Sequence, residues 1–141
     1  IKDDMRLISV VLGTKSDKAR TQNSQTLLNF GFRFFETHRL YQAHEVLKSA
    51  RVWYGDKEQV TLGVQKDIFI NIGKGLYKDL DASVEIDPDI SAPIAMGQVL
   101  GQLNIKLGSE VVVTEPLVAM QAVNDGGIVQ KVIDRMKRFF Q

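Results

Sequence analysis

Residues 97–115 read GQVLGQLNIKLGSEVVVTE, and this stretch decides the fold class. In its first half, apolar or small side chains recur at every second position, at Val99, Gly101, Leu103, Ile105 and Leu107. This alternation predicts a β-strand with one buried face. Gly108-Ser109 provides a turn, and the valine-rich run after it predicts a second strand. Pro116 is expected to end that second strand, because proline cannot donate to a strand ladder.

Further strand patterns lie upstream of this hairpin. The run SARVWYGDKEQVTLGV (residues 49–64) is two β-type stretches around Gly55-Asp56, which is a hairpin signal. DIFINI (residues 67–72) places three isoleucines on one side of a strand. DLDASVEI (residues 79–86) places Leu80, Ala82, Val84 and Ile86 on one face and mostly acids on the other. Short strands at this spacing predict a mainly β domain, an antiparallel sandwich or barrel, and we expect a small antiparallel β-sandwich.

The first 37 residues have a different pattern. LISVVL (residues 7–12) predicts a short buried strand, after which Ser16 or Asp17 can cap a helix. Five positions of that helix share one face: Leu27, Leu28, Gly31, Phe34 and Phe35. FGFRFF (residues 30–35) also alternates like a strand, but no turn signal separates it from Leu27, so the helix is expected to stop near Thr37. The boundary with the β-rich part should lie near residues 37–40.

The composition excludes several classes of protein. The 141 residues have room for one domain or two small ones, and 44% hydrophobic content is enough to bury a core. A net charge of +1 gives no overall field for nucleic acid, and the lack of cysteine excludes disulfides and cysteine-ligated zinc. No apolar run reaches the ~18 residues of a transmembrane helix. Because the chain starts at Ile1, close to a strand pattern, we expect its true start to lie upstream.

Residues that could carry chemistry are few. His38 and His44 are six apart, whereas a helical metal pair needs a spacing of four, so both are interpreted as ordinary linker histidines. The acids from Asp79 to Asp89 lack the glycine and glutamate of a calcium loop, and alternation explains most of them as the wet face of a strand. Trp53 and Tyr54 could form a sugar-stacking platform, but one of them is expected in the core, because neighbours on a strand face opposite ways.

Catalytic motifs are also missing from the sequence. IGKGLYK (residues 72–78) lacks the spacing of a phosphate-binding loop and predicts a turn between strands. No serine has a lysine three residues later, and neither Lys-Thr-Gly nor Ser-Asp-Asn occurs. We therefore predict no catalytic residue, no metal ligand and no cofactor in this chain, and expect it to be inactive on its own.

Several separate blocks of the chain, kept in order, carry a resemblance to a known family. They are MRLISVVLG (5–13), LLNFGFRFFET (27–37), RVWYGD (51–56), LYKDLDAS (76–83), APIAMGQVLGQLNIKL (92–107) and EPLVAM (115–120). Together they resemble the C-terminal part of the low-molecular-mass penicillin-binding proteins, in particular the penicillin-binding protein 5/6 type D-alanyl-D-alanine carboxypeptidases. The resemblance covers nearly the whole chain, but the family's catalytic Ser-x-x-Lys, Ser-x-Asn and Lys-Thr-Gly motifs lie upstream of its first block.

The resemblance implies an organisation and a function. Residues 1–37 would be the last strand and helix of an incomplete serine β-lactamase-like catalytic domain, residues 38–125 a β-rich domain, and residues 126–141 an amphipathic anchoring helix. The longer protein would be a periplasmic, serine-type hydrolase that acylates its serine with D-Ala-D-Ala peptides during peptidoglycan remodelling. This portion would hold the catalytic domain above the inner membrane, with lipid and peptidoglycan as partners and no nucleic acid. The alternative is a β-sandwich module that binds peptidoglycan or a protein.

The tail IVQKVIDRMKRFFQ (residues 128–141) has its own amphipathic pattern. At ~100° per residue, its large apolar side chains fall within an arc of about 120°. The predicted anchor consists of Val129, Val132, Ile133, Met136, Phe139 and Phe140, with the cations Lys131, Arg135, Lys137 and Arg138 outside that arc. Fourteen residues make a helix of roughly 21 Å, too short to span ~30 Å of hydrocarbon but suited to lying in the interface. A helix packed on the β-rich domain is the alternative.

Exposed apolar residues in the N-terminal part predict self-association. Unpaired strand edges and apolar helix faces drive association, and the sheet that would cover them is not in this chain. The predicted contact residues are Leu7, Ile8, Val10, Leu27, Leu28, Phe34 and Phe35. A symmetric homodimer through this segment is the expected arrangement, with packing on the β-rich domain as the alternative.

Overall fold

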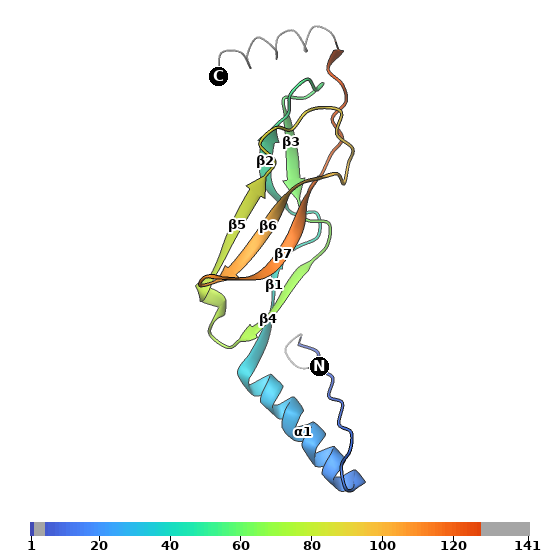
Figure 1. Cartoon of the computed structure of the whole chain (residues 1–141), viewed down its shortest axis with the longest axis vertical. Coiled ribbons are helices and arrows are strands. Elements are labelled where there is room, and N and C mark those ends of the chain that lie inside the picture. The colour runs from blue at the N-terminus through green and yellow to red at the C-terminus, as the bar shows by residue number, and fades with distance from the viewer. Residues whose placement is uncertain (2–4, 128–141) are drawn as a thin grey trace. The chain divides into compact units, whose positions relative to one another are not determined.

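The computed structural model describes residue 1 and residues 5–127 (Figure 1). The described residues divide into two compact units, one within residues 1–39 and 69–79 and the other within residues 40–68 and 80–127. The predicted mainly β fold is confirmed, since seven strands and one long helix make up the regular structure of the described residues. None of the helices described is long and apolar enough to cross a membrane. The predicted anchor residues lie outside the described residues.

Helix α1 (Asp17–Phe34) begins where the sequence predicts. Ser16 has extended dihedral angles and its side chain accepts a hydrogen bond from the Ala19 N–H, so it is the N-cap. The predicted end near Thr37 is wrong by three residues, because Phe35 is already extended and starts strand β1 (Phe35–Tyr41). The strand-like alternation of FGFRFF therefore holds for its last residue, Phe35, because β1 pairs with β4 and this pairing prevents the helix from continuing.

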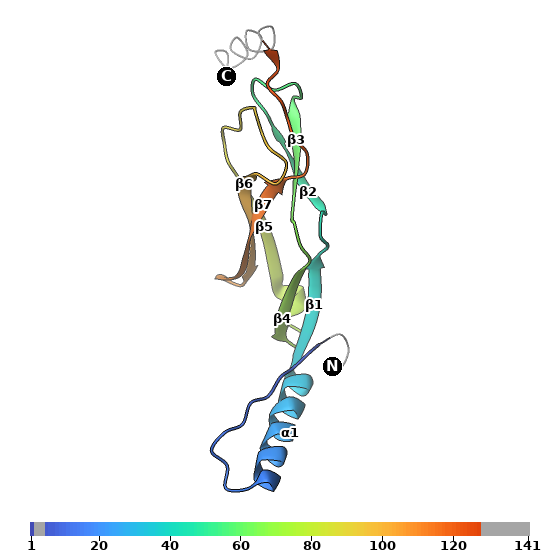
Figure 2. The same ribbon diagram turned by 90° about the vertical axis from the view of Figure 1, so that its right-hand side faces the viewer.

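The predicted strand over Leu7–Leu12 is wrong. Residues 7–12 are irregular. Among the described residues before α1, only Met5 takes part in a β-bridge. A strand needs a hydrogen-bonded neighbour, and no described residue pairs with this run. The segment instead lies beside α1 (Figure 2). Leu7 rests against Gly31, where an added Cβ would collide with the leucine side chain.

Strands β1 and β4 (Ile68–Gly73) form a two-stranded sheet. Ile68, Ile70 and Ile72 are buried while the residues between them are exposed, which confirms the predicted alternation. The turn after β4, with Gly75 at φ +85°, leads into the short 3₁₀ helix η1 (Tyr77–Asp79). IGKGLYK is therefore the predicted turn.

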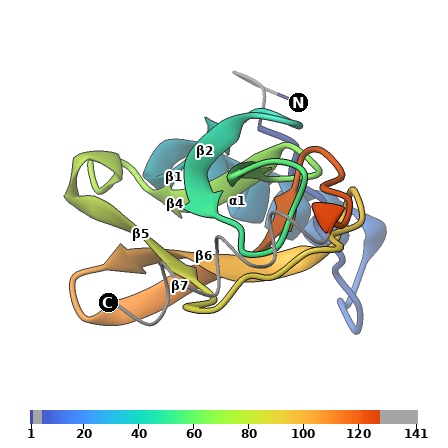
Figure 3. The same cartoon turned by 90° about the horizontal axis from the view of Figure 1, so that it is seen from above.

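The second unit is built on a five-stranded antiparallel sheet in the order β2-β3-β7-β6-β5 (Figure 1). Its strands are β2 (Val46–Arg51), β3 (Gln59–Gly63), β5 (Leu80–Ile86), β6 (Val99–Leu107) and β7 (Glu110–Ala119). Both predicted hairpins, at Gly55-Asp56 and Gly108-Ser109, are confirmed. Leu47 on one edge strand and Val84 on the other pack on the same buried clusters, so the sheet curls around its core (Figure 3).

Strand β7 passes through Pro116 rather than ending there. Pro116 lies opposite Gln102 of β6, whereas β3 pairs with β7 only at Val118 and Ala119. The missing proline N–H therefore leaves no partner in β3 unsatisfied, which is why the prediction of a break is wrong. The carbonyl and N–H groups of the neighbouring residues continue the ladder with β6.

A β-bulge changes the alternation at the start of β6. The register shifts between Val99 and Gly101, so Leu100 is buried while Val99, predicted to face the core, is 56% exposed. Gly101 lies so close to β5 that a Cβ there would collide with the backbone carbonyl of Glu85. Ala82 of β5, also predicted to be on the apolar face, is exposed. Further along β6, Leu103 and Ile105 are buried as predicted, but Asn104 between them is buried as well, where the alternation predicts an exposed side chain.

Candidate functional site

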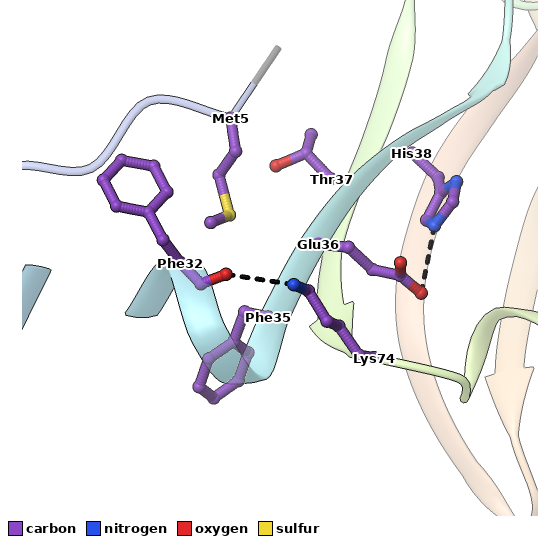
Figure 4. A pocket seen from close by; sticks show the side chains of 7 residues that line it. All are labelled: Met5, Phe32, Phe35, Glu36, Thr37, His38 and Lys74. Carbon is purple, nitrogen blue, oxygen red and sulfur yellow. Dashed lines mark hydrogen bonds and ion pairs between the residues drawn. The ribbon is translucent and has the colours of Figure 1, made fainter. Parts of the chain in front are cut away.

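The first unit contains a pocket where α1 runs into β1 (Figure 4). Its volume is about 290 Å³. The residues that line it are Met5, Phe32, Phe35, Glu36, Thr37, His38 and Lys74. The sequence patterns place Phe35 in a self-association surface, His38 in a linker, Thr37 at a helix end and Lys74 in a turn, and they place none of them in a pocket. The only sequence feature that pointed toward this pocket was Lys74, the lysine between two glycines in IGKGLYK.

Lys74 completes the C-terminus of α1. Its backbone N–H donates to the Phe34 carbonyl at 2.9 Å, and its Nζ donates to the Phe32 carbonyl at 3.1 Å. The last carbonyls of a helix have no partner inside the helix, and a cation there also complements the helix dipole. The turn after β4 therefore supplies what the end of α1 lacks (Figure 4).

Glu36 and His38 form the polar side of this pocket. Glu36 Oε1 accepts a hydrogen bond from the Gly75 N–H at 3.2 Å and lies 3.2 Å from His38 Nε2. The Gly75 N–H, followed by the bond to His38, lowers the pKa of Glu36 below its ordinary value, because both stabilise the carboxylate. The His38 ring stacks on Tyr77 with centroids 4.2 Å apart. His38 is thus a half-buried, engaged residue rather than an ordinary linker histidine.

This group of residues can hold the helix-to-strand junction but has no nucleophile poised for chemistry. Thr37, the one hydroxyl in the lining, donates to Asn71 Oδ1 of the neighbouring strand at 2.6 Å. We call Glu36, His38, Lys74, Gly75 and Tyr77 the junction latch. His44 lies in the other unit, at a turn with φ +64°, where its N–H donates to the Val64 carbonyl.

The other candidates from the sequence are in the second unit. Trp53 is buried, which confirms that one of the two neighbouring aromatic residues belongs to the core. The Arg51 guanidinium lies 3.9 Å from the centre of its ring, so the sugar-stacking interpretation is wrong for Trp53. Glu85 of the acidic strand β5 accepts a hydrogen bond from Gln102 Nε2 at 2.8 Å. Among the described residues, no three acids or histidines come together as metal ligands would.

The first unit also carries exposed apolar side chains, which we call the N-terminal apolar surface. Ile8, Val10 and Leu12 are at least three-quarters exposed, and Leu27, Phe30, Phe34 and Phe35 are 41–54% exposed. Leu7 and Leu28 are half-buried. A shallow groove of about 410 Å³ runs between residues 10–12 and the α1 residues Asn23, Thr26 and Leu27. The predicted self-association residues therefore lie on one unit, and their role stays a prediction.

The sequence from β1 to the end of the second unit matches a known domain. Residues 35–125 match the family described as penicillin-binding protein 5, C-terminal domain. The chain belongs to this family. The match starts at the first residue of β1 and ends two residues before the last described one.

Relatives of known identity extend the similarity to residues before β1. The chain is 39% identical over 137 residues to the D-alanyl-D-alanine carboxypeptidase DacA of Escherichia coli (strain K12), covering 96% of this chain and 34% of that protein. It is 41% identical over 140 residues to DacC of the same organism, covering 98% and 35%. The chain thus spans about a third of the length of the curated relatives it matches.

Solved structures give the same result. The penicillin-binding protein 5 of Haemophilus influenzae superposes with a TM-score of 0.83 at 38% identity, over 89% of this chain and 37% of that one. The carboxypeptidase DacD of Francisella tularensis superposes with a TM-score of 0.60 at 30% identity, over 82% and 29%. The predicted resemblance to the C-terminal part of penicillin-binding protein 5 type carboxypeptidases is therefore confirmed.

Proposed function

We propose that this chain is the positioning portion of a serine-type D-Ala-D-Ala carboxypeptidase that acts on peptidoglycan in the periplasm. It would hold a catalytic domain above the outer face of the inner membrane. The observation that carries the proposal is the alignment of nearly the whole chain with about a third of proteins named D-alanyl-D-alanine carboxypeptidases. The catalytic motifs of such enzymes are absent from the present sequence.

The N-terminal apolar surface supports this role. Large exposed apolar areas on a soluble protein mark contacts with another protein surface. The catalytic domain of a longer protein would supply such a surface for Ile8, Val10 and the exposed aromatic rings of α1. The junction latch would then hold α1 against β1 and β4, and so limit movement at the start of the β-rich part.

The charge and apolar pattern of residues 128–141 supports attachment to lipid. Four cations and one acid accompany the apolar arc, and each cation near an anionic leaflet contributes about 1 kcal/mol. The alternative is docking on the second unit. Among the described loops nearest the point where the tail begins, residues 51–58 and 120–127 have no large exposed apolar side chain, and residues 87–98 have one, Met96. A membrane therefore offers the apolar arc a better partner.

Vesicle flotation tests the proposed attachment. The 141-residue chain should float with anionic vesicles, and replacing Phe139 and Phe140 with Ser should weaken binding at least about tenfold, since burying each ring contributes roughly 1.5–3 kcal/mol. Higher salt should weaken binding further. Replacing Val111 and Val112 of β7 with Ser provides a control that removes exposed apolar residues elsewhere. Absence of wild-type binding would reject the attachment.

The enzymatic part of the proposal has a separate test. The chain alone should not be labelled by a fluorescent penicillin, because it lacks the serine and lysine of the motif. A protein extended upstream to include that motif should be labelled. The competing proposal, a module that binds peptidoglycan or a protein partner, predicts that purified peptidoglycan retains the chain even after residues 128–141 are removed. Such retention would favour the binding module.

A further inference from the structure

The last described residues of the chain are held in place by a dense set of hydrogen bonds in the second unit. Gly55 and Asp125 form an antiparallel bridge, and so do Ile94 and Val123. The segment 122–126 therefore lies between two loops and pairs with both. Val123 is completely buried, and its Cγ1 lies so near Gly55 that no Cβ fits there.

Asp56 and Asn124 make the centre of this arrangement. The Asp56 N–H donates to the Asn124 carbonyl at 2.8 Å, and the Asn124 N–H donates to Asp56 Oδ1 at 2.9 Å. The Asn124 side-chain amide donates to Asp56 Oδ2 at 3.1 Å. One carboxylate thus binds both the backbone and the side chain of a single residue. Hydrogen bonds to a charged group are stronger than those between neutral groups.

Two further contacts extend the pairing along the chain in both directions. Lys57 Nζ donates to the Ala122 carbonyl at 3.2 Å, before Asn124. The Gly126 N–H donates to the Tyr54 carbonyl at 2.8 Å, after it. The next residue, Gly127, has φ +74°, and its N–H bonds only locally, to Asp125 Oδ1. The fixed part of the chain therefore extends to Gly126, two residues before the amphipathic sequence begins.

We infer that this exit clamp, made of Asp56, Asn124, Lys57 and the Gly126–Tyr54 bond, sets the angle at which the β-rich domain stands on a lipid surface. The inference rests on the proposed function and adds to it the residues that would transmit orientation. A firmly held exit confines the joint to the backbone that follows the Gly126 N–H, at Gly127, so tilting of the domain is limited by few dihedral angles. A loosened exit adds residues 124–126 to that joint, whereas Val123 stays held by its bridge to Ile94.

The far end of the β-rich domain lies a long way from this joint. Strand β7 runs from the β6–β7 turn at Gly108-Ser109 toward the clamp, and its ten residues cover roughly 33 Å. A small change of angle at the clamp would therefore move Ser109 by many ångströms relative to the membrane. The chain has no cysteine, so Ser109→Cys permits labelling at a single site.

The test measures energy transfer from a donor attached to the single thiol of the Ser109→Cys variant to acceptor lipids in anionic phosphatidylglycerol-containing vesicles, together with binding by flotation. In that labelled background, Asp56→Ala should keep vesicle affinity within about twofold while energy transfer at saturation rises by a third or more, because the domain tilts toward the surface. Asp56→Asn lacks the charge but keeps the oxygen that accepts the Asn124 N–H, and the Asn124 amide can turn so that its oxygen accepts from the new side-chain N–H; its transfer should therefore lie closer to wild type than that of Asp56→Ala. Equal behaviour of the two variants would assign the effect to charge and overturn the clamp.

Hydrogen exchange in the free chain gives a readout that needs no membrane. Asp56→Ala and Asn124→Ala should each speed exchange of the Gly126 N–H at least tenfold, while amides of the β6–β7 hairpin keep their wild-type rates. Unchanged Gly126 exchange would overturn the clamp, and so would faster exchange throughout the unit, because it would show global destabilisation instead. If the wild type does not bind vesicles, the proposed attachment fails and this inference with it. If it binds and Asp56→Ala leaves transfer unchanged, only the inference fails.

Discussion

Glu36 and His38, two residues apart on strand β1, face the same side, with Oε1 and Nε2 3.2 Å apart. Alternate residues of a strand share a face, so the spacing alone permits the contact. What completes it lies some forty residues later, where the Gly75 N–H binds the same carboxylate oxygen and Tyr77 stacks on the imidazole. The turn after β4 therefore recognises both residues at once.

The lowered pKa of Glu36 predicts a dependence of local stability on pH. A carboxylate whose pKa is lowered on folding stabilises the folded state when the pH is above the ordinary pKa of 4.5. This contribution is lost as the pH falls through the lowered pKa. The protection of the Gly75 N–H, which is its exchange rate compared with the intrinsic rate of an unprotected amide at the same pH, should therefore decrease as the pH falls through the lowered pKa of Glu36. Glu36→Gln should exchange faster at neutral pH and show a weaker acid dependence. Asp17→Asn, at an exposed ion pair of the same unit, is the control and should behave as wild type.

The hydrogen bond between the buried Asn104 and the exposed Thr114 predicts a cost for losing one hydroxyl. Asn104 is the one buried polar side chain in the described part of the chain, and Thr114 Oγ1 donates to its Oδ1 at 2.9 Å. Thr114→Val leaves that oxygen unpaired and should lower the free energy of unfolding by about 1–3 kcal/mol. Adding Asn104→Leu should recover part of the loss in urea titration. A double variant less stable than Thr114→Val would contradict this account.

Two glycines predict different costs for the same added methyl group. At Gly101 a Cβ meets the backbone carbonyl of Glu85, whereas at Gly31 it meets the tip of the Leu7 side chain. Backbone held in a ladder cannot move aside, but a leucine can change rotamer. Gly101→Ala should therefore cost about 1–3 kcal/mol in thermal or urea unfolding. Gly31→Ala should cost less, because alanine also favours helix. The reverse order would show that β5 and β6 separate more easily than the ladder suggests.

The N-terminal apolar surface predicts self-association of the isolated chain. Val10 and Leu27 line the same shallow groove, and both are more than half exposed. In sedimentation velocity the wild type should form dimers, and replacing Val10 and Leu27 with Ser should shift it to monomer. Val112→Ser, on the exposed face of β7, should leave the dimer intact. A wild-type chain that stays monomeric at its highest soluble concentration would remove the dimer from consideration.

The sequence by itself determined the two hairpins of the β-rich part, the helix start and the family. Period-two alternation, the Ser16 cap and the two glycine turns are local patterns, and local patterns follow from backbone sterics and hydrogen bonding alone. Tertiary structure decided where α1 ends, whether Leu7–Leu12 becomes a strand and how β7 continues through Pro116. Each of these depends on a partner outside the segment itself: Lys74 for the helix end, a neighbouring strand for residues 7–12, and β6 for β7.

The junction latch and the exit clamp could not be predicted from the sequence for the same reason. Glu36 with Gly75, and Asp56 with Asn124, are ordinary polar residues until the fold brings them within hydrogen-bonding distance.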